Sequence, residues 1–119
     1  MKLINPEDKE RKENPGYSKK VLLDENELGN PWSFVQQIKI KAGETAESHH
    51  HKIQTEIFIL LNENGYRIVN GEEIHPKAWE VLVIEPNDLH TVIASKTNDY
   101  IYRAFKIKYD KDDLYRDKK

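Results

Sequence analysis

Residues 33–41 read SFVQQIKIK, a segment whose alternating side chains are typical of an extended β-strand. Side chains two positions apart point to the same face of a strand. Ile38 and Ile40 share one face and Lys39 lies on the other, so the face with the isoleucines is expected to lie in the interior. Gln36 lies on the same face, so a polar side chain is expected in the interior.

Short runs of the same kind recur along the chain and are rich in β-branched and aromatic residues. Turn-forming residues separate them, and Asn70-Gly71 is a two-residue hairpin signal. The runs are KVLLD (20–24), EIFILLN (56–62), YRIVN (66–70), EVLVIEP (80–86), LHTVIAS (89–95) and YIYRAFKIKY (100–109). The pattern predicts an all-β antiparallel domain, which must form a sandwich or a barrel because each strand has to bury one face.

The length of 119 residues is typical of a single domain, in which we expect three parts. Residues 1–19 are polar and show no period, so they are expected to form a mobile or loosely draped arm. Residues 20–109 carry the strand pattern of the barrel domain. Residues 110–119 are densely charged and are expected to form a frayed C-terminal tail.

The charge balance and the absence of cysteine limit which partners and which kind of metal site are expected. The chain carries 19 basic and 21 acidic side chains, a formal net charge of −2, so neither nucleic acid nor a membrane is an expected partner. The chain has no cysteine, so a metal site would have to use nitrogen and oxygen ligands. No run resembles a signal peptide or a membrane-spanning helix, and a cytoplasmic location is expected.

A second polar residue is expected in the interior, in the run YIYRAFKIKY. Arg103 shares a face with Ile101 and lies opposite Lys106, which assigns Arg103 to the interior. A buried arginine needs a partner. Two roles are open: an internal salt bridge, for example with Glu56, or a grip on a substrate carboxylate or phosphate. In the second role Arg103 and Gln36 would bind an anionic substrate at the mouth of a pocket.

The stretch GETAESHHHKIQTE sets three consecutive histidines before a glutamate. In an extended segment His49 and His51 point to the same face, about 7 Å apart at the backbone, so both can bind one ion. Glu56 opens the next strand, and His90 opens the strand that follows the turn EPND. Three imidazoles and one carboxylate suit a divalent first-row metal ion. The alternative interpretation is a solvated polar loop.

The other two histidines are not expected to bind the metal. His50 alternates with its neighbours and points away from the proposed ligands, toward solvent or a supporting position. His75 precedes Pro76 and is expected to be exposed at the edge of a loop.

These residues resemble the first motif of the cupin superfamily, which is a glycine, five residues, His-x-His, three or four residues, then a glutamate. The matching residues are Gly43, His49, His51 and Glu56. The segment VIEPNDLH resembles the second cupin motif and carries His90 into the fourth ligand position. The resemblance extends over about residues 32–108.

Some positions of the second motif depart from the family pattern. Trp79 and Asn87 stand where the motif has glycines, and Glu85 stands where it has a proline. Asparagine tolerates a left-handed backbone, so the turn at Asn87 is expected to form. Gly65 comes later than the corresponding glycine, which implies a longer hairpin.

The resemblance implies a double-stranded β-helix, a jelly-roll barrel of two antiparallel sheets, of the small single-domain conserved-barrel type. It also implies one divalent transition metal ion, Fe, Mn, Ni, Zn or Co, inside the mouth of the barrel. The cupin fold serves many functions. Our first hypothesis is a metal-dependent enzyme, an isomerase or a dioxygenase, that acts on a small polar or anionic molecule such as a sugar or a keto acid. The alternative is a non-catalytic module that binds or senses a metal or ligand.

The run EIFILL also predicts an assembly. If Glu56 and Phe58 face the interior, then Ile57, Ile59 and Leu61 form an apolar stripe on the outer face of the sheet. Such stripes are seldom left in contact with water. We therefore expect a homodimer, in which the N-terminal arm or the strand around KVLLD crosses onto the partner.

Overall fold

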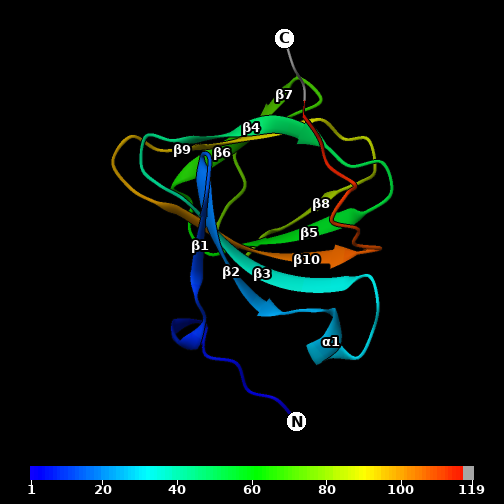
Figure 1. The fold of residues 1–119 in the computed structure, drawn as a ribbon. Helices are drawn as coiled ribbons and strands as arrows, with labels where there is room; N and C mark the ends of the chain where they lie inside the picture. The colour runs from blue at the N-terminus through cyan, green and yellow to red at the C-terminus, as the bar shows by residue number, and fades with distance from the viewer. Residues whose placement is uncertain (117–119) are drawn as a thin grey trace.

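The computed structural model describes residues 1–116, which form two antiparallel sheets that face each other across the interior (Figure 1). The six-stranded sheet runs in the order β1 (Arg11–Asn14), β2 (Tyr17–Leu23), β3 (Ser33–Ile40), β10 (Tyr100–Ile107), β5 (Thr55–Leu60) and β8 (Val81–Ile84). The five-stranded sheet runs in the order β11 (Tyr115–Arg116), β4 (Thr45–His50), β9 (His90–Ala94), β6 (Gly65–Val69) and β7 (Glu72–Ile74). The helical turns are η1 (Pro6–Asp8) and α1 (Glu25–Leu28). The expected all-β barrel of two antiparallel sheets is confirmed.

The core lies between the two sheets and follows the period of two in the strands. In β3 and β5 every second side chain is buried, and Ile38 and Leu60 flank Tyr102 of β10 in the register of the sheet. The buried apolar cluster consists of Ile38, Ile40, Ala46, Phe58, Leu60, Ile84, Val92, Ala94, Tyr100, Tyr102 and Ala104. The interior faces expected for these two strands, including the polar Gln36, are confirmed.

The prediction that Arg103 faces the interior from β10 is wrong. Tyr102 and Ala104 are buried, so Arg103 lies on the opposite, outer face, where its Nε donates a hydrogen bond to Gln37 Oε1 at 3.1 Å. The large tyrosine rings fill the interior, and the interior position at the end of the strand is occupied by Lys106, which lines a cavity. A lysine at the edge of a cavity can keep its ammonium group solvated while its stem stays inside.

The N-terminal segment belongs to the sheet for much of its length. Residues 11–19, expected in the arm, form β1 and the first part of β2, so a boundary after residue 19 divides a strand. Lys20 Nζ donates a hydrogen bond to the carbonyl oxygen of Pro6 at 3.1 Å, and Arg11 Nη1 donates to Ser18 Oγ at 2.9 Å. These contacts fold the polar segment over the outer face of β2, where Ser18 and Lys20 are buried.

The charged C-terminal segment crosses between the two sheets (Figure 1). After β10 in the six-stranded sheet, the chain reaches the edge of the other sheet, where Tyr115 and Arg116 of β11 pair with His50 and His49 of β4. Residues 110–116 thus form a structured connection along the open side of the barrel, whereas residues 117–119 of the expected tail lie outside the described residues. In residues 1–116 there is no helix of the length and apolar character needed to cross a membrane.

Candidate metal centre

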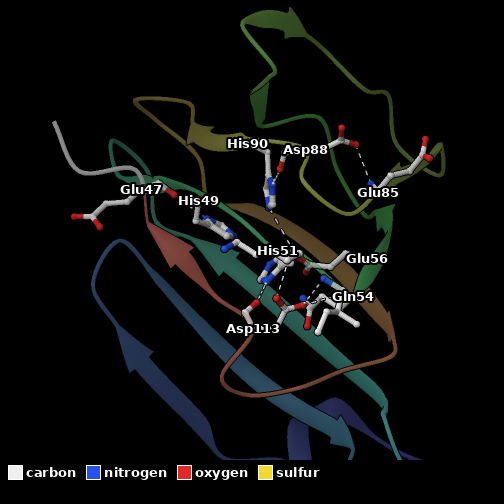
Figure 2. Close-up of polar contacts among 11 residues, drawn as sticks. Glu47, His49, His51, Gln54, Glu56, Glu85, Asp88, His90 and Asp113 are labelled. Carbon is white, nitrogen blue, oxygen red and sulfur yellow. Dashed lines mark hydrogen bonds and ion pairs between the residues drawn. The ribbon is translucent and has the colours of Figure 1, made fainter.

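Four side chains from three strand ends meet inside the mouth of the barrel. His49 ends β4 together with His50, and His51 follows directly; Glu56 lies at the start of β5, and His90 is the first residue of β9. The register pairs His49 with His90 across the sheet. One possible ligand atom from each of His49, His51, Glu56 and His90 lies within 4.8 Å of those of the other three. Figure 2 shows the three rings and the carboxylate pointing toward one another.

The turn before His90 forms with the expected backbone. Asn87 has a φ of 72°, in the left-handed region that asparagine tolerates. Its N–H donates a hydrogen bond to the carbonyl oxygen of His51 at 2.6 Å. The turn between β8 and β9 is thereby attached to the segment that carries the histidines.

Each of the three rings has its Nδ1 against a backbone carbonyl oxygen. The partners are Glu47 for His49 at 2.8 Å, Asp88 for His90 at 3.1 Å, and Asp113 for His51. A carbonyl oxygen only accepts, so in each neutral ring Nδ1 carries the proton and Nε2 has a free lone pair. This arrangement orients a metal-binding imidazole and selects Nε2 as the ligand atom.

The buried ligand atoms fit a metal ion better than they fit one another. His51 Nε2 lies 2.7 Å from Glu56 Oε1, and His90 Nε2 lies 3.8 Å from the same oxygen. None of these three atoms makes a hydrogen bond of acceptable geometry within the described residues. Lone pairs of two acceptors at such a distance repel unless a proton or a cation lies between them. The group could therefore hold a metal ion.

The protonation states of the group suit metal binding at neutral pH. Burial raises the pKa of Glu56, but the neighbouring His51 ring and the charge of Lys106 outweigh it and bring the pKa to about 2. Burial, together with the nearby His49 ring, lowers the pKa of His90 to about 4. Burial also lowers the pKa of His49. At neutral pH the group thus offers the Glu56 carboxylate and the unprotonated rings of His49 and His90.

The two other histidines lie away from this group. His50 stacks on Tyr115, with the ring centroids 5.4 Å apart. His75 is exposed, and its Nε2 lies 2.9 Å from a carboxylate oxygen of Glu73. Both placements agree with the alternation of side chains along β4 and with the loop expected around His75.

A cavity of about 140 Å³ lies beside the four side chains. Gln36, expected at the pocket, is buried and lines this cavity. Arg103 does not line it, because its side chain lies on the other face of β10. Lys106 and Lys19 line the cavity in its place. Tyr100, Tyr102 and Lys106 share one face of β10, so placing the tyrosines in the interior would have predicted Lys106 at the cavity.

The buried arginine of the core is Arg67, which the sequence interpretation missed. Its side chain is fully buried on β6, and the guanidinium carbon lies 4.4 Å and 4.2 Å from the ring centroids of Phe58 and Tyr102. Stacking on aromatic faces stabilises a buried cation. The alternation in YRIVN sets Arg67 opposite the apolar Tyr66 and Ile68 and so favours an outer position, which gave no signal for its burial.

Asp113 supports the histidine segment from the C-terminal segment. Its carboxylate accepts hydrogen bonds from the backbone N–H groups of Lys52, Ile53 and Gln54 at 2.8 to 2.9 Å, and its carbonyl oxygen accepts from His51. Burial raises the pKa of Asp113, but the three N–H donors outweigh it and lower the pKa. Figure 2 shows Asp113 beside His51 and Gln54. The charge-rich sequence around Asp113 contains no signal for this role.

Solved structures share the fold of the chain. The predicted oxalate decarboxylase from Thermotoga maritima is 19% identical, with a TM-score of 0.78, over 89% of this chain and 98% of that one. The polyketide cyclase RemF from Streptomyces resistomycificus is 12% identical, with a TM-score of 0.83, over 98% and 84% of the two chains. A double-stranded β-helix domain protein from Klebsiella pneumoniae is 17% identical, with a TM-score of 0.78, over 100% and 99%. No family model matches the sequence, and no curated protein matches it.

Proposed function

We propose that this chain, which has the cupin-type double-stranded β-helix fold, is a metal-dependent enzyme that acts on a small polar or anionic molecule. The reaction would be an isomerisation or an oxidation of a substrate such as a sugar or a keto acid. The observation that carries the proposal is the group of three imidazoles, each with its Nδ1 against a backbone carbonyl oxygen, and one ionised carboxylate at the wall of a cavity.

The ligand set favours one divalent transition metal ion, Fe, Mn, Ni, Zn or Co, because it combines three nitrogen donors with one oxygen donor. His49, His51, Glu56 and His90 would hold it. Such an ion, when bound, supplies Lewis acidity toward a substrate oxygen and, if it is redox-active, electron transfer. Several of these metals accept additional ligands, which leaves room for a substrate.

The chain's own residues define the environment of the reaction. The backbone carbonyl oxygens at Nδ1 hold the three rings in orientation, and the low pKa of Glu56 keeps its carboxylate charged. Phe58 and Tyr102 form part of the apolar wall, which excludes water from one side of the cavity. Gln36 presents a buried carboxamide that can orient a polar substrate.

The related structures do not select the reaction. One is described as a predicted oxalate decarboxylase and another as a polyketide cyclase, so one fold supports different chemistries. The substrate class proposed for this chain therefore depends on its own cavity.

The alternative is a non-catalytic module that binds or senses a metal or a small ligand. One observation favours it: two acidic side chains of the cavity wall are already engaged and are poorly placed to move protons. Glu47 lies 3.4 Å from Arg116, and Asp113 accepts three backbone hydrogen bonds.

Elemental analysis and activity assays on the same preparation test the proposal. We expect about one equivalent of a divalent transition metal per chain. We also expect turnover in a panel of sugars and keto acids, measured as isomerisation or as substrate-dependent oxygen uptake. Absence of stoichiometric metal after loading would contradict the metal site. Bound metal with an inert panel would favour the binding module.

A further inference from the structure

Two lysines face the cavity beside the metal-binding group. Lys106 lies directly opposite Phe34 of β3 and Glu56 of β5 in the register of the sheet, which places it on the interior face. Lys19 of β2 lies opposite Ile38, and both lysines line the cavity and are half-buried. The positive charges are thus next to the ligand group and share its cavity.

Three of the four acidic side chains that line the cavity have other partners, and the fourth, Glu56, belongs to the ligand group. Glu47 pairs with Arg116, Asp113 accepts three backbone N–H groups, and Asp110 Oδ1 accepts the N–H of Asp112. Among residues 1–116, none of the ion pairs within 4.0 Å includes a lysine of this cavity wall. Lys19, Lys106 and the exposed Lys111, which also lines the cavity, therefore have no carboxylate oxygen within 4.0 Å among the described residues, although the charge of Lys106 acts on Glu56 at longer range.

The two ammonium groups also affect each other. Burial lowers the pKa of Lys19, and the positive charge of Lys106 lowers it further. The Lys106 Nζ lies 5.1 Å from the ring centroid of Tyr109 and 5.7 Å from that of Phe34, contacts that orient the ammonium group but do not cancel its charge. An anion beside both groups would relieve this repulsion.

Gln36 adds an uncharged polar group to the same wall. The residue is 3% exposed, and its Oε1 has no hydrogen-bond partner within the described residues. Buried carboxamides are normally hydrogen-bonded. This unpaired acceptor, in the cavity with the two lysines, favours an occupant that also carries a hydrogen-bond donor such as a hydroxyl group.

We propose that Lys106, assisted by Lys19, binds the carboxylate of a small organic anion whose adjacent oxygen faces the His49, His51, Glu56 and His90 group. The inference rests on the proposed function and names its substrate class. Two ammonium donors match the two oxygens of a carboxylate, and charge-assisted hydrogen bonds of this kind are short and strong. Gln36 Oε1 is an acceptor and would take a hydrogen bond from a hydroxyl group of the same molecule. The occupant would be held at two points, which fixes its orientation.

Calorimetry with a matched pair of probes tests this assignment. Glycolate and glycolamide have nearly the same shape, but only glycolate is charged. They would be titrated into the zinc-loaded full chain, its Lys106→Met variant and a control, Lys41→Met. Lys41 is exposed, does not line the cavity and has the same charge, so its variant matches the change in net charge.

We expect the parent to bind glycolate at least about tenfold more tightly than glycolamide, a difference of about 1.4 kcal/mol. Lys106→Met should lose about tenfold or more in glycolate affinity and still bind zinc, whereas Lys41→Met should bind glycolate like the parent. Equal binding of glycolate and glycolamide by the parent, absence of glycolate binding, or a Lys106→Met variant that binds like Lys41→Met would overturn the assignment. Inorganic phosphate binding more tightly than glycolate would overturn the choice of a carboxylate.

Whether the parent protein binds zinc distinguishes failure of this inference from failure of the proposed function. If zinc does not bind the parent, the proposed function fails, and the same titrations on the metal-free protein decide the lysine site alone. A loss of glycolate binding in metal-free Lys106→Met would support the site. Unchanged binding there would reject it.

Discussion

At the scale of single residues, His51 has two ring nitrogens with different tasks. Its Nδ1 donates to the carbonyl oxygen of Asp113, and its Nε2 faces Glu56 at 2.7 Å. The neighbouring His50 has the same side chain but stacks on Tyr115, away from the group. Because alternate residues of a strand face opposite sides, identical residue types one position apart have different environments.

This difference predicts the response to substitution. His51→Ala or Glu56→Ala should abolish stoichiometric metal binding, because each removes a buried ligand atom. His50→Ala should leave the metal content nearly unchanged. Elemental analysis of the purified variants measures both effects, and loss of metal in His50→Ala with retention in His51→Ala would exclude the proposed ligand set.

The pKa of His90 predicts how the stability of the metal-free protein depends on pH. Burial and the nearby His49 lower this pKa from 6.5 to about 4, so the unfolded chain binds a proton at higher pH than the folded chain does. The neutral His90 ring therefore contributes its full stability above the pKa of the unfolded state, and this contribution is lost as the pH falls through the pKa of the folded state. The free energy of unfolding should therefore fall between about pH 6.5 and about pH 4, by about 2 to 3 kcal/mol.

Urea denaturation of the chelator-treated protein at several pH values measures this slope. His90→Gln is the matched variant, because it keeps a polar side chain and removes the titration. Its unfolding free energy should depend less on pH than that of the parent over the same range. Parallel curves for the two proteins would show that His90 is not the group responsible.

At the scale of elements, the C-terminal segment and the histidine segment depend on each other. Residues 51–54 donate to Asp113 through one imidazole and three backbone N–H groups. The turn at Asn87 donates to the carbonyl oxygen of His51 from the other side. The position of one metal ligand therefore depends on two connections that are distant in the sequence.

Asp113→Ala keeps the carbonyl oxygen that accepts from His51 but removes the carboxylate that holds the backbone of residues 52–54. It should weaken metal binding by about tenfold or more, because groups that position a metal ligand typically contribute at this level. It should also destabilise the metal-free protein, because three backbone N–H groups lose their acceptor. Asp112→Ala is the control, since Asp112 is an exposed neighbour. Metal titration and urea denaturation measure the two effects, and equal behaviour of the two variants would refute the role of Asp113.

At the scale of the whole molecule, the outer face of the six-stranded sheet carries an apolar stripe. Ile57 lies opposite Val83 and Ile59 lies opposite Val81, and the two valines are 48% and 59% exposed. Strand β2, which includes residues 20–23, pairs with β1 and β3 of its own sheet rather than extending away. The stripe on β5 and β8 is therefore the surface that we propose for a homodimer.

Sedimentation velocity at micromolar concentration tests this assembly. The parent is expected to sediment as a dimer, and Val83→Lys as a monomer, because a lysine in the stripe would have to lose its hydration on association. Leu3→Lys is the control, since Leu3 is exposed and far from the stripe in sequence. A parent protein that sediments as a strict monomer would end the proposal.

Much of the architecture follows from local sequence. The alternation in residues 33–41 and 56–62 assigns interior faces correctly, because the period of two is a property of the strand itself. The hairpin at Asn70-Gly71 and the turn at Asn87 form where their backbone preferences predict, both with positive φ at asparagine. The same local rules select His49, His51, Glu56 and His90, which the structure brings together.

The faces and contacts that the sequence did not reveal depend on neighbours distant along the chain. Alternation divides β10 into two sets but does not say which set is interior. Tyr100 and Tyr102 take that position in a core with Ile40 and Leu60, which places Arg103 outside and Lys106 at the cavity. The sequence by itself thus determined most strands of the barrel and the candidate ligands, but not the strands in the N-terminal and C-terminal segments. Only tertiary packing decided the charge of the cavity wall and the role of Asp113, because both arise from contacts between segments that no local pattern links.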